Sequence, residues 1–140
     1  MILLDTNVIS EPARPKPAEA VLRWFDEFES AGFCLSSVTE AELRRGIATM
    51  PEGKAKREKL ALLINVLEVD FAGLILPFES KSAFFYAEIF AHHKIIGRPI
   101  SVLDCMIAAI ARANGCKLAT RNVADFGQCG VEIVNPWARA

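Results

Sequence analysis

Three acidic residues, Asp5, Glu42 and Asp104, have the types and positions from which a catalytic site could be built. Asp5 ends an apolar run over residues 2–4, and Asp104 is the only charge between residues 102 and 111. A carboxylate carried into a core is costly unless it is paired, hydrogen-bonded or bound to a metal ion. If the fold brings these acids together, their mutual repulsion calls for a divalent cation, and that combination indicates phosphodiester chemistry.

Each of these acids also has a purely structural interpretation. Asp5 could cap the helix that follows it, and Asp104 could pair with Ser101 in a capping box. The apolar neighbours of Asp104 and the strand-end position of Asp5 favour a site over these alternatives. Glu42 stays open, because it could form a shifted capping box with Thr39 or be one more exposed helix acid.

Three further candidates follow the apolar segment at residues 117–119. Asn122 or Asp125 could supply an additional metal ligand, directly or through water, although both residue types also form turns. Thr120 could donate a hydrogen bond to a carboxylate that binds the metal ion.

Composition indicates one domain over residues 1–140, with 52% hydrophobic and 24% charged residues. The net charge of −1 gives no global attraction to nucleic acid. The basic stretch at residues 44–59 could be either a solvated helix face or a nucleic-acid contact. Four cysteines without CxxC spacing, no expected signal peptide and no apolar run of about 20 residues predict a reduced, cytoplasmic protein without a membrane span.

Short apolar runs alternate with helical patterns along the chain. Strands are expected at residues 2–4, 32–35, 74–76, 117–119 and 131–134. This order predicts an α/β three-layer sandwich around a short parallel sheet of four to five strands, with helices on both faces. Ligands bind beyond the carboxyl ends of such strands, where Asp5 and residues 120–122 lie. Ser37 and Ser101 are the expected caps of the helices that carry Glu42 and Asp104.

The order of the motifs resembles the PIN-domain family, specifically the VapC toxins of bacterial toxin–antitoxin pairs. The opening and closing segments, Asp5 to Glu11 and Asn135-Pro136-Trp137, resemble the FitB-type branch. The motifs span essentially the whole chain: Leu3-Leu4-Asp5-Thr6-Asn7, Thr39-Glu40-Ala41-Glu42-Leu43-Arg44-Arg45-Gly46, Leu103-Asp104-Cys105-Met106-Ile107-Ala108-Ala109 and Ala119-Thr120-Arg121-Asn122-Val123-Ala124-Asp125-Phe126.

The resemblance implies a PIN-like sandwich whose acidic pocket binds Mg²⁺ or Mn²⁺ and hydrolyses RNA to 5′-phosphate and 3′-hydroxyl ends. Asp5, Glu42 and Asp104 match the three principal acids of the family. Asn122 stands where many relatives have Asp, which puts a second tightly held metal ion in doubt. Asp125 lies at a different offset and is not its equivalent.

The same resemblance implies a homodimer and a small DNA-binding antitoxin, which could join the dimer in a larger hetero-oligomer. Arg44 and Arg45 are the basic residues expected to contact the RNA backbone.

Two other functions compete with the ribonuclease. A catalytically weak PIN module could act mainly by complexing a DNA-binding antitoxin, as in the FitB branch. A haloacid-dehalogenase-like phosphatase also begins with an apolar strand that ends in Asp, but it needs a second Asp where this chain has Asn7.

Overall fold

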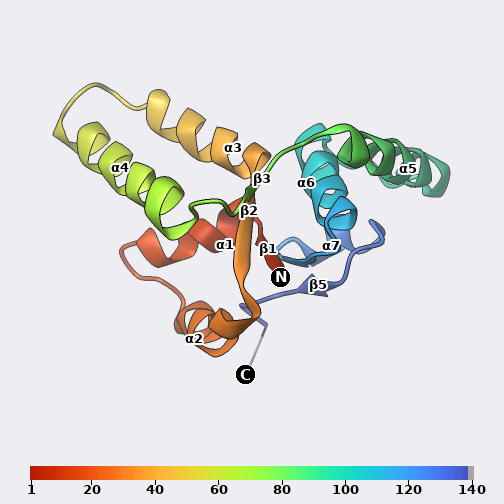
Figure 1. Ribbon diagram of the computed structural model, residues 1–140, viewed down its shortest axis with the longest axis horizontal. Helices are drawn as coiled ribbons and strands as arrows, with labels where there is room; N and C mark the ends of the chain where they lie inside the picture. Colours follow the sequence, from red (N-terminus) through yellow and green to blue (C-terminus); the bar gives the residue numbers. More distant parts are fainter. Residues whose placement is uncertain (139–140) are drawn as a thin grey trace.

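Five short strands form one parallel sheet in the order β3-β2-β1-β4-β5 (Figure 1). The computed structural model describes residues 1–138. The strands are β1 (Ile2–Leu4), β2 (Phe33–Ser36), β3 (Ile75–Leu76), β4 (Lys117–Ala119) and β5 (Ile133–Val134). β1 lies between β2 and β4, with Ile2 opposite both Phe33 and Lys117. The carboxyl end of β1, where Asp5 follows, is therefore at the centre of the sheet edge.

Helices connect the strands as the sequence predicts. They are α1 (Thr6–Ser10), α2 (Glu19–Phe28), α3 (Ser37–Ala48), α4 (Lys54–Asn65), α5 (Ser80–Ile96), α6 (Val102–Ala113) and α7 (Val123–Phe126). Short 3-10 segments, η1 (Glu11–Ala13) and η2 (Glu29–Ala31), follow α1 and α2, and a π-helical segment, η3 (Val66–Asp70), extends α4. Within residues 1–138, no helix is long and apolar enough to cross a membrane.

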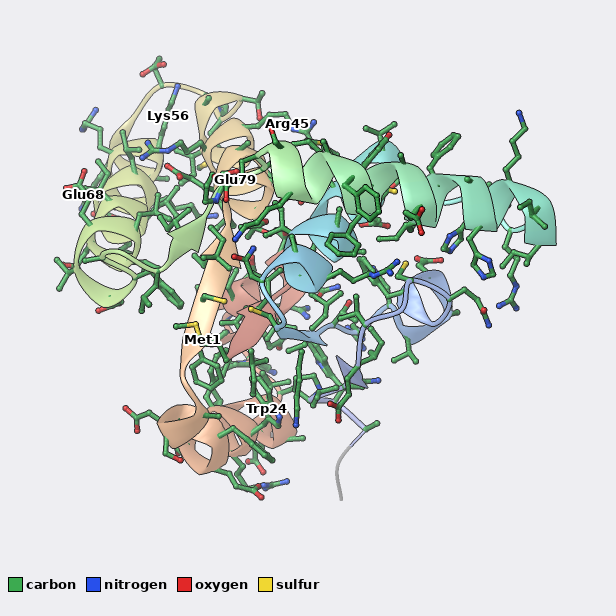
Figure 2. The ribbon with its side chains drawn as sticks, turned by 45° about the vertical axis from the view of Figure 1, so that its right-hand side comes forward. Met1, Trp24, Arg45, Lys56, Glu68 and Glu79 are labelled. Carbon is green, nitrogen blue, oxygen red and sulfur yellow. The ribbon has the colours of Figure 1, made fainter. Side chains whose placement is uncertain are left out.

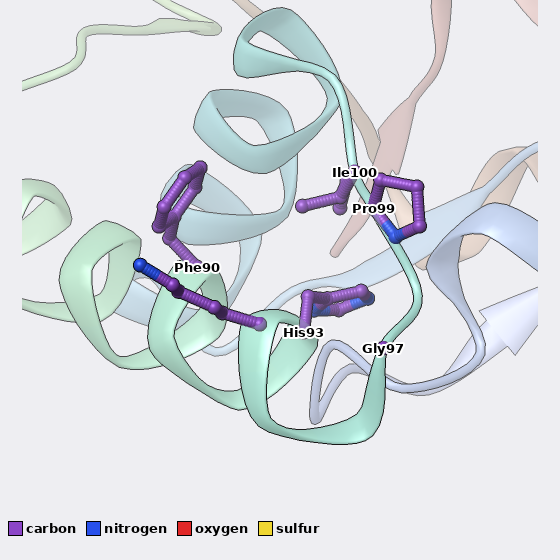
Figure 3. A pocket seen from close by; sticks show the side chains of 6 residues that line it. Phe90, His93, Gly97, Pro99 and Ile100 are labelled. Atoms are coloured by element: carbon purple, nitrogen blue, oxygen red, sulfur yellow. The ribbon is translucent and has the colours of Figure 1, made fainter.

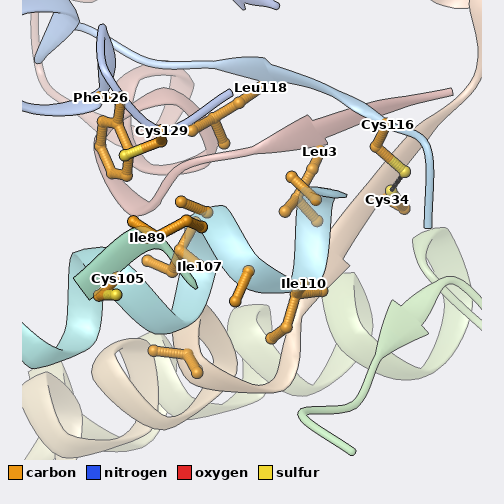
Figure 4. Packing of buried hydrophobic residues seen from close by; sticks show 14 residues of the cluster. Leu3, Cys34, Ile89, Cys105, Ile107, Ile110, Cys116, Leu118, Phe126 and Cys129 are labelled. Carbon is orange, nitrogen blue, oxygen red and sulfur yellow. Dashed lines mark hydrogen bonds between the residues drawn. The ribbon is translucent and has the colours of Figure 1, made fainter. Parts of the chain in front are cut away.

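Strand residues alternate between two hydrophobic clusters, one on each face of the sheet. Leu3 and Leu118 pack with α5, α6 and α7, whereas Leu4 and Ala119 pack with α1, α2 and α4 (Figures 1 and 4). Successive side chains of a strand point to opposite faces, so strands buried on both sides must be apolar throughout. This arrangement confirms the predicted three-layer sandwich.

The aromatic stripe of α2 belongs to the second of these clusters. Trp24, only 1% exposed, lies with its ring centroid 5.3 Å from that of Phe33 on β2 (Figure 2). Phe25 and Phe28 also contact Trp24. These rings form core, as their helical spacing indicates.

The four cysteines are free and buried. Cys34 Sγ lies 3.9 Å from Cys116 Sγ in the cluster that α6 shares with β1, β2 and β4 (Figure 4). Burial raises the pKa of the Cys34 thiol to about 12, so this side chain stays protonated. Cys34 and Cys116 therefore act as small apolar core residues.

One predicted cap is wrong and the other is confirmed. Ser36, not Ser37, caps α3: its Oγ accepts a hydrogen bond of 3.0 Å from the Thr39 amide. Ser36 keeps the extended backbone of β2, whereas Ser37 is already helical, and a capping residue must be non-helical. Ser101 Oγ accepts from the Asp104 amide at 3.1 Å and caps α6 as expected.

Candidate active site

Asp5 links the end of β1 to the start of α1. Its amide donates to the Ala119 carbonyl of β4 at 2.9 Å, and the residue is only 4% exposed. Oδ1 accepts from the Thr6 amide at 2.8 Å, and Oδ2 accepts from Thr120 Oγ1 at 2.7 Å. Asp5 is thus the cap of α1. A carboxylate oxygen has two acceptor positions, so each oxygen can still accept one further contact.

Thr120 connects the end of β4 to this carboxylate. Its side chain is fully buried, and besides donating to Asp5 its Oγ1 accepts from the Asn122 amide at 3.0 Å. The structure therefore contains the hydrogen bond expected of Thr120, and the turn at residues 120–122 is held against Asp5.

Glu42 projects from α3 toward the same sheet edge. Its Oε1 accepts a hydrogen bond of 2.8 Å from Thr6 Oγ1, which also lies 3.2 Å from Thr39 Oγ1. The contact with α1 rules out a capping-box role and a wholly exposed position for Glu42.

Thr6 is the residue that sequence reasoning missed. Through its amide it contacts Asp5 and through its hydroxyl it contacts Glu42, so one residue orients both acids. The sequence feature that could have indicated a role for Thr6 is its position directly after Asp5. The hydroxyl's partner lies 36 positions away and could not be read from the chain.

Asp104 is half-buried in the first turn of α6. Burial raises the pKa of this carboxyl, and the negative charges of Asp5, Asp125 and Glu42 raise it further, against a hydrogen bond with Ser101 that lowers it. Ser101 caps α6 through the Asp104 amide, which is one of the two hydrogen bonds of the predicted capping box. The fold nevertheless places the three predicted acids close enough for their charges to interact.

Asp5 shows the same pattern. Burial raises the pKa of its carboxyl, the hydrogen bonds from Thr120 and Thr6 lower it, and the charge of Glu42 raises it again. None of the ion pairs formed by residues 1–138 involves Asp5, Glu42 or Asp104. In the part of the chain that the structure describes, no Lys or Arg side chain therefore neutralises the charge of these acids by direct contact.

Oxygen ligands with uncompensated negative charge suit a hard divalent cation such as Mg²⁺ or Mn²⁺. As the side chains stand, however, no group of three or more His, Cys, Asp or Glu among the described residues could hold a metal ion. Hydrogen bonds direct Asp5 and Glu42 toward their threonine partners. The donor set fits the cation chemically, and rotation of the half-buried Asp104 and Glu42 side chains would have to close the site around it.

The remaining candidates lie around this cluster. Asn122 is exposed at the start of α7. Asp125 is also exposed, and its negative charge raises the pKa of Asp104. Arg44 pairs with Glu40 at 2.8 Å, and Arg45 is exposed on α3 (Figure 2). No hydrogen bond or ion pair in the described part of the chain joins either arginine to the three acids.

The chain matches a family of known proteins. The model of the PIN domain matches residues 2–127. This chain belongs to the PIN-domain family. Among relatives of this PIN domain, toxin FitB of Neisseria gonorrhoeae is 43% identical over 98% of the chain and 99% of its own length. VapC ribonuclease Y4jK of Sinorhizobium fredii is 42% identical over the whole of both chains.

A solved structure of FitAB bound to an IR36 DNA fragment superposes on this PIN domain with a TM-score of 0.89. It is 40% identical in sequence, and the match covers 100% of this chain and 98% of the other. The sheet order and the sandwich described above are therefore those of PIN-domain toxins.

A second buried acid besides Asp5, Glu11, was not singled out from the sequence. It is 3% exposed; its Oε2 accepts from the Ala18 amide at 2.9 Å and its Oε1 from Arg14 Nη1 at 3.2 Å. The Ala18 hydrogen bond is the main cause that lowers the pKa of this carboxyl. Glu11 thus holds the proline-rich loop that leads into α2.

Proposed function

We propose that this PIN domain, formed by residues 1–140, is the toxin of a toxin–antitoxin pair and hydrolyses RNA phosphodiesters with the help of a divalent cation. The observation that carries the proposal is the electrostatic proximity of Asp5, Glu42 and Asp104 at one sheet edge, where none of the three forms an ion pair with a Lys or Arg side chain of residues 1–138. The ribonuclease relative Y4jK, aligned over the whole chain, supports the same chemistry.

Mg²⁺ or Mn²⁺ bound there would lower the pKa of a water molecule and neutralise charge that develops on the phosphate. Asp5 and Asp104 would hold the ion, and Glu42 would contact it directly or through water. Thr120 and the Thr6 amide keep the Asp5 carboxylate oriented, and the Thr6 hydroxyl does the same for Glu42. Asn122, in place of a fourth acid, supports one tightly held ion rather than two, and Asp125 adds negative charge nearby.

The partners follow from the same proposal. The substrate is RNA. Arg45 would contact the RNA backbone, and Arg44 would do so once it is released from Glu40. The protein works as a homodimer in the cytoplasm and binds a small DNA-binding antitoxin in a larger hetero-oligomer. The FitAB structure on DNA supports a partner of this kind.

Cleavage of total cellular RNA by the purified, partner-free protein tests the activity. With Mg²⁺ or Mn²⁺ the wild type should produce fragments with 5′-phosphate ends, and Asp5→Asn should be at least about 100-fold slower. Loss of cleavage on chelation and recovery with either ion would identify the cation. An Asp5→Asn protein that cleaves like wild type would refute the role of the acids.

A catalytically weak module that acts through its DNA-binding partner is the second candidate. Asn122 at the expected fourth acidic position favours it, and so does the similarity to FitB. Wild type that binds operator DNA together with its antitoxin but leaves RNA intact with both metals would support this candidate. Because the chain is a PIN domain, we do not propose the phosphatase.

A further inference from the structure

The C-terminal end of α5 borders two adjoining hollows that lie outside the acid cluster. The first has a volume of about 380 Å³ and is lined by Phe90, His93, Lys94, Gly97, Pro99 and Ile100. Figure 3 shows Phe90 and His93 of α5 facing Pro99 and Ile100 of the next segment. The second hollow, of about 270 Å³, shares His93, Gly97 and Pro99 and adds Arg98, Asp125 and Gln128 among its lining residues.

The backbone at Gly97 shapes the wall between the hollows. Gly97 has a φ of 68°, a left-handed conformation that ends α5, and the Arg98 amide then donates to the His93 carbonyl at 3.0 Å. The chain turns back and reaches Ser101, the cap of α6. The wall of the hollows therefore continues directly into the helix that carries Asp104.

Asp125 places the second hollow beside the acid site. It lines this hollow and belongs to α7, which contacts α6, the helix that carries Asp104. A ligand in the hollows would thus sit next to the acids without occupying their position.

Two cationic side chains, Lys94 and Arg98, line the hollows. Within residues 1–138, the side chains of Lys94 and Arg98 form no ion pair and no hydrogen bond. Three acids at the reaction centre repel a polyanion, so the RNA backbone needs cations close by. Lys94 and Arg98 offer positive charge on the side of the site that α5 forms.

The same hollows present a flat aromatic surface and hydrogen-bond acceptors. Phe90 is 44% exposed and stacks on Tyr86 with ring centroids 6.2 Å apart and planes at 14°. Unstacked RNA bases bind to such rings, and their edges are recognised by hydrogen bonds. The Asp125 carboxylate and the Gln128 amide oxygen can accept hydrogen bonds from base amino groups or ribose hydroxyls.

From these features we infer that the two hollows form a subsite for one nucleotide of single-stranded RNA adjacent to the phosphate that is cleaved. The base lies against Phe90, and the backbone phosphate contacts Arg98 and Lys94. The inference rests on the proposed ribonuclease function and names the part of the site that binds its substrate.

Binding of a fluorescent, short single-stranded oligoribonucleotide to the Asp5→Asn protein tests the subsite without cleavage. Fluorescence anisotropy over a range of salt concentrations gives both Kd and the salt slope. Arg98→Ala should raise Kd roughly 5- to 10-fold and lower the slope by about 1, because one phosphate contact is lost. Phe90→Ala should raise Kd by about the same factor and leave the slope unchanged, since stacking is lost instead.

Matched controls come from the same chain. Phe84→Ala removes another exposed ring of α5, 62% exposed, and Arg23→Ala removes an exposed arginine of α2. Both controls should bind the oligoribonucleotide like the parent protein. Thermal unfolding of all variants checks that each one is folded.

Equal affinities of Arg98→Ala, Phe90→Ala and the two controls would overturn the subsite, as would a parent protein that binds no RNA. Light scattering provides a further check, because a change in molecular mass without a change in RNA affinity would mark the hollows as a contact between protein chains. Failure of the proposed function is a separate result: wild type would then leave cellular RNA intact.

Discussion

Thr120 Oγ1 donates a hydrogen bond of 2.7 Å to Asp5 Oδ2, which joins the carboxyl ends of two neighbouring strands. Both side chains are buried. A buried carboxylate that loses a donor bears an added desolvation cost, so this contact supports the fold as well as the geometry of the candidate site.

Thr120→Val keeps the shape of the side chain and removes this donor. The free energy of unfolding at pH 7 should fall by about 1–3 kcal/mol, and the pKa of Asp5 should rise further. Urea unfolding measures the first effect. Thr49→Val is the control, because the exposed Thr49 hydroxyl bonds only to backbone carbonyls of its own helix. Equal effects of the two substitutions would argue against a stabilising Thr120–Asp5 contact.

Asp104→Asn should stabilise the metal-free protein at neutral pH. The pKa of Asp104 is raised above its ordinary value of 3.8, so the folded state binds this proton more tightly than the unfolded chain. The ionised carboxylate therefore lowers stability above the raised pKa. This penalty shrinks as the pH falls through that pKa and is absent below 3.8.

Thermal unfolding of wild type and Asp104→Asn between pH 3 and pH 8 follows this difference. We expect a higher Tm for the variant at pH 7 and equal Tm values at the acid end. Asp26→Asn, at an exposed position of α2, should show no such pattern. A variant less stable than wild type at pH 7 would mean that the helix-dipole contribution of Asp104 exceeds the repulsion.

Divalent cations should stabilise the wild type and fail to stabilise Asp5→Asn or Asp104→Asn. A ligand that binds only the folded state adds about 2.7 kcal/mol to the free energy of unfolding at 100 times its Kd. Differential scanning fluorimetry with Mg²⁺ or Mn²⁺, and with matched ionic strength as control, measures the shift. Equal shifts in wild type and both variants would place the cation elsewhere on the protein.

Thr6→Val should remove the hydrogen bond to Glu42, while the backbone amide of residue 6 still donates to Asp5. Because a misplaced catalytic group lowers the rate, we expect RNA cleavage to fall about 10- to 100-fold in kcat with little change in KM. Thr6→Ser retains the hydroxyl and should restore most of the rate. If Thr6→Ser is as slow as Thr6→Val, Thr6 acts through packing and not through its hydrogen bond to Glu42.

Asn122→Asp restores the acid that the family pattern places here. The added charge should lower the Tm of the metal-free protein and increase the shift produced by Mn²⁺, since carboxylates bind hard cations more tightly than amides do. Fluorimetry with and without Mn²⁺ tests both effects. An unchanged response to Mn²⁺ would show that position 122 does not face the ion.

Those residues of the candidate site that stand out against their neighbours in the sequence could be predicted. Asp104 stands out because a charge among apolar residues is costly, and Asp5 because it ends an apolar run. The caps were less certain: Ser36 and Ser37 are adjacent serines, and only the backbone conformation decides which one is non-helical.

Apolar runs and helical patterns in the sequence predict the alternation of strands and helices, and with it the parallel sheet that puts Asp5 and residues 120–122 at one edge. Which side chains orient the acids depends instead on tertiary packing. Thr6 reaches Glu42 across 36 positions and Thr120 reaches Asp5 across 115. Such contacts depend on how strands and helices pack in space, and no local pattern of residue types encodes that distance.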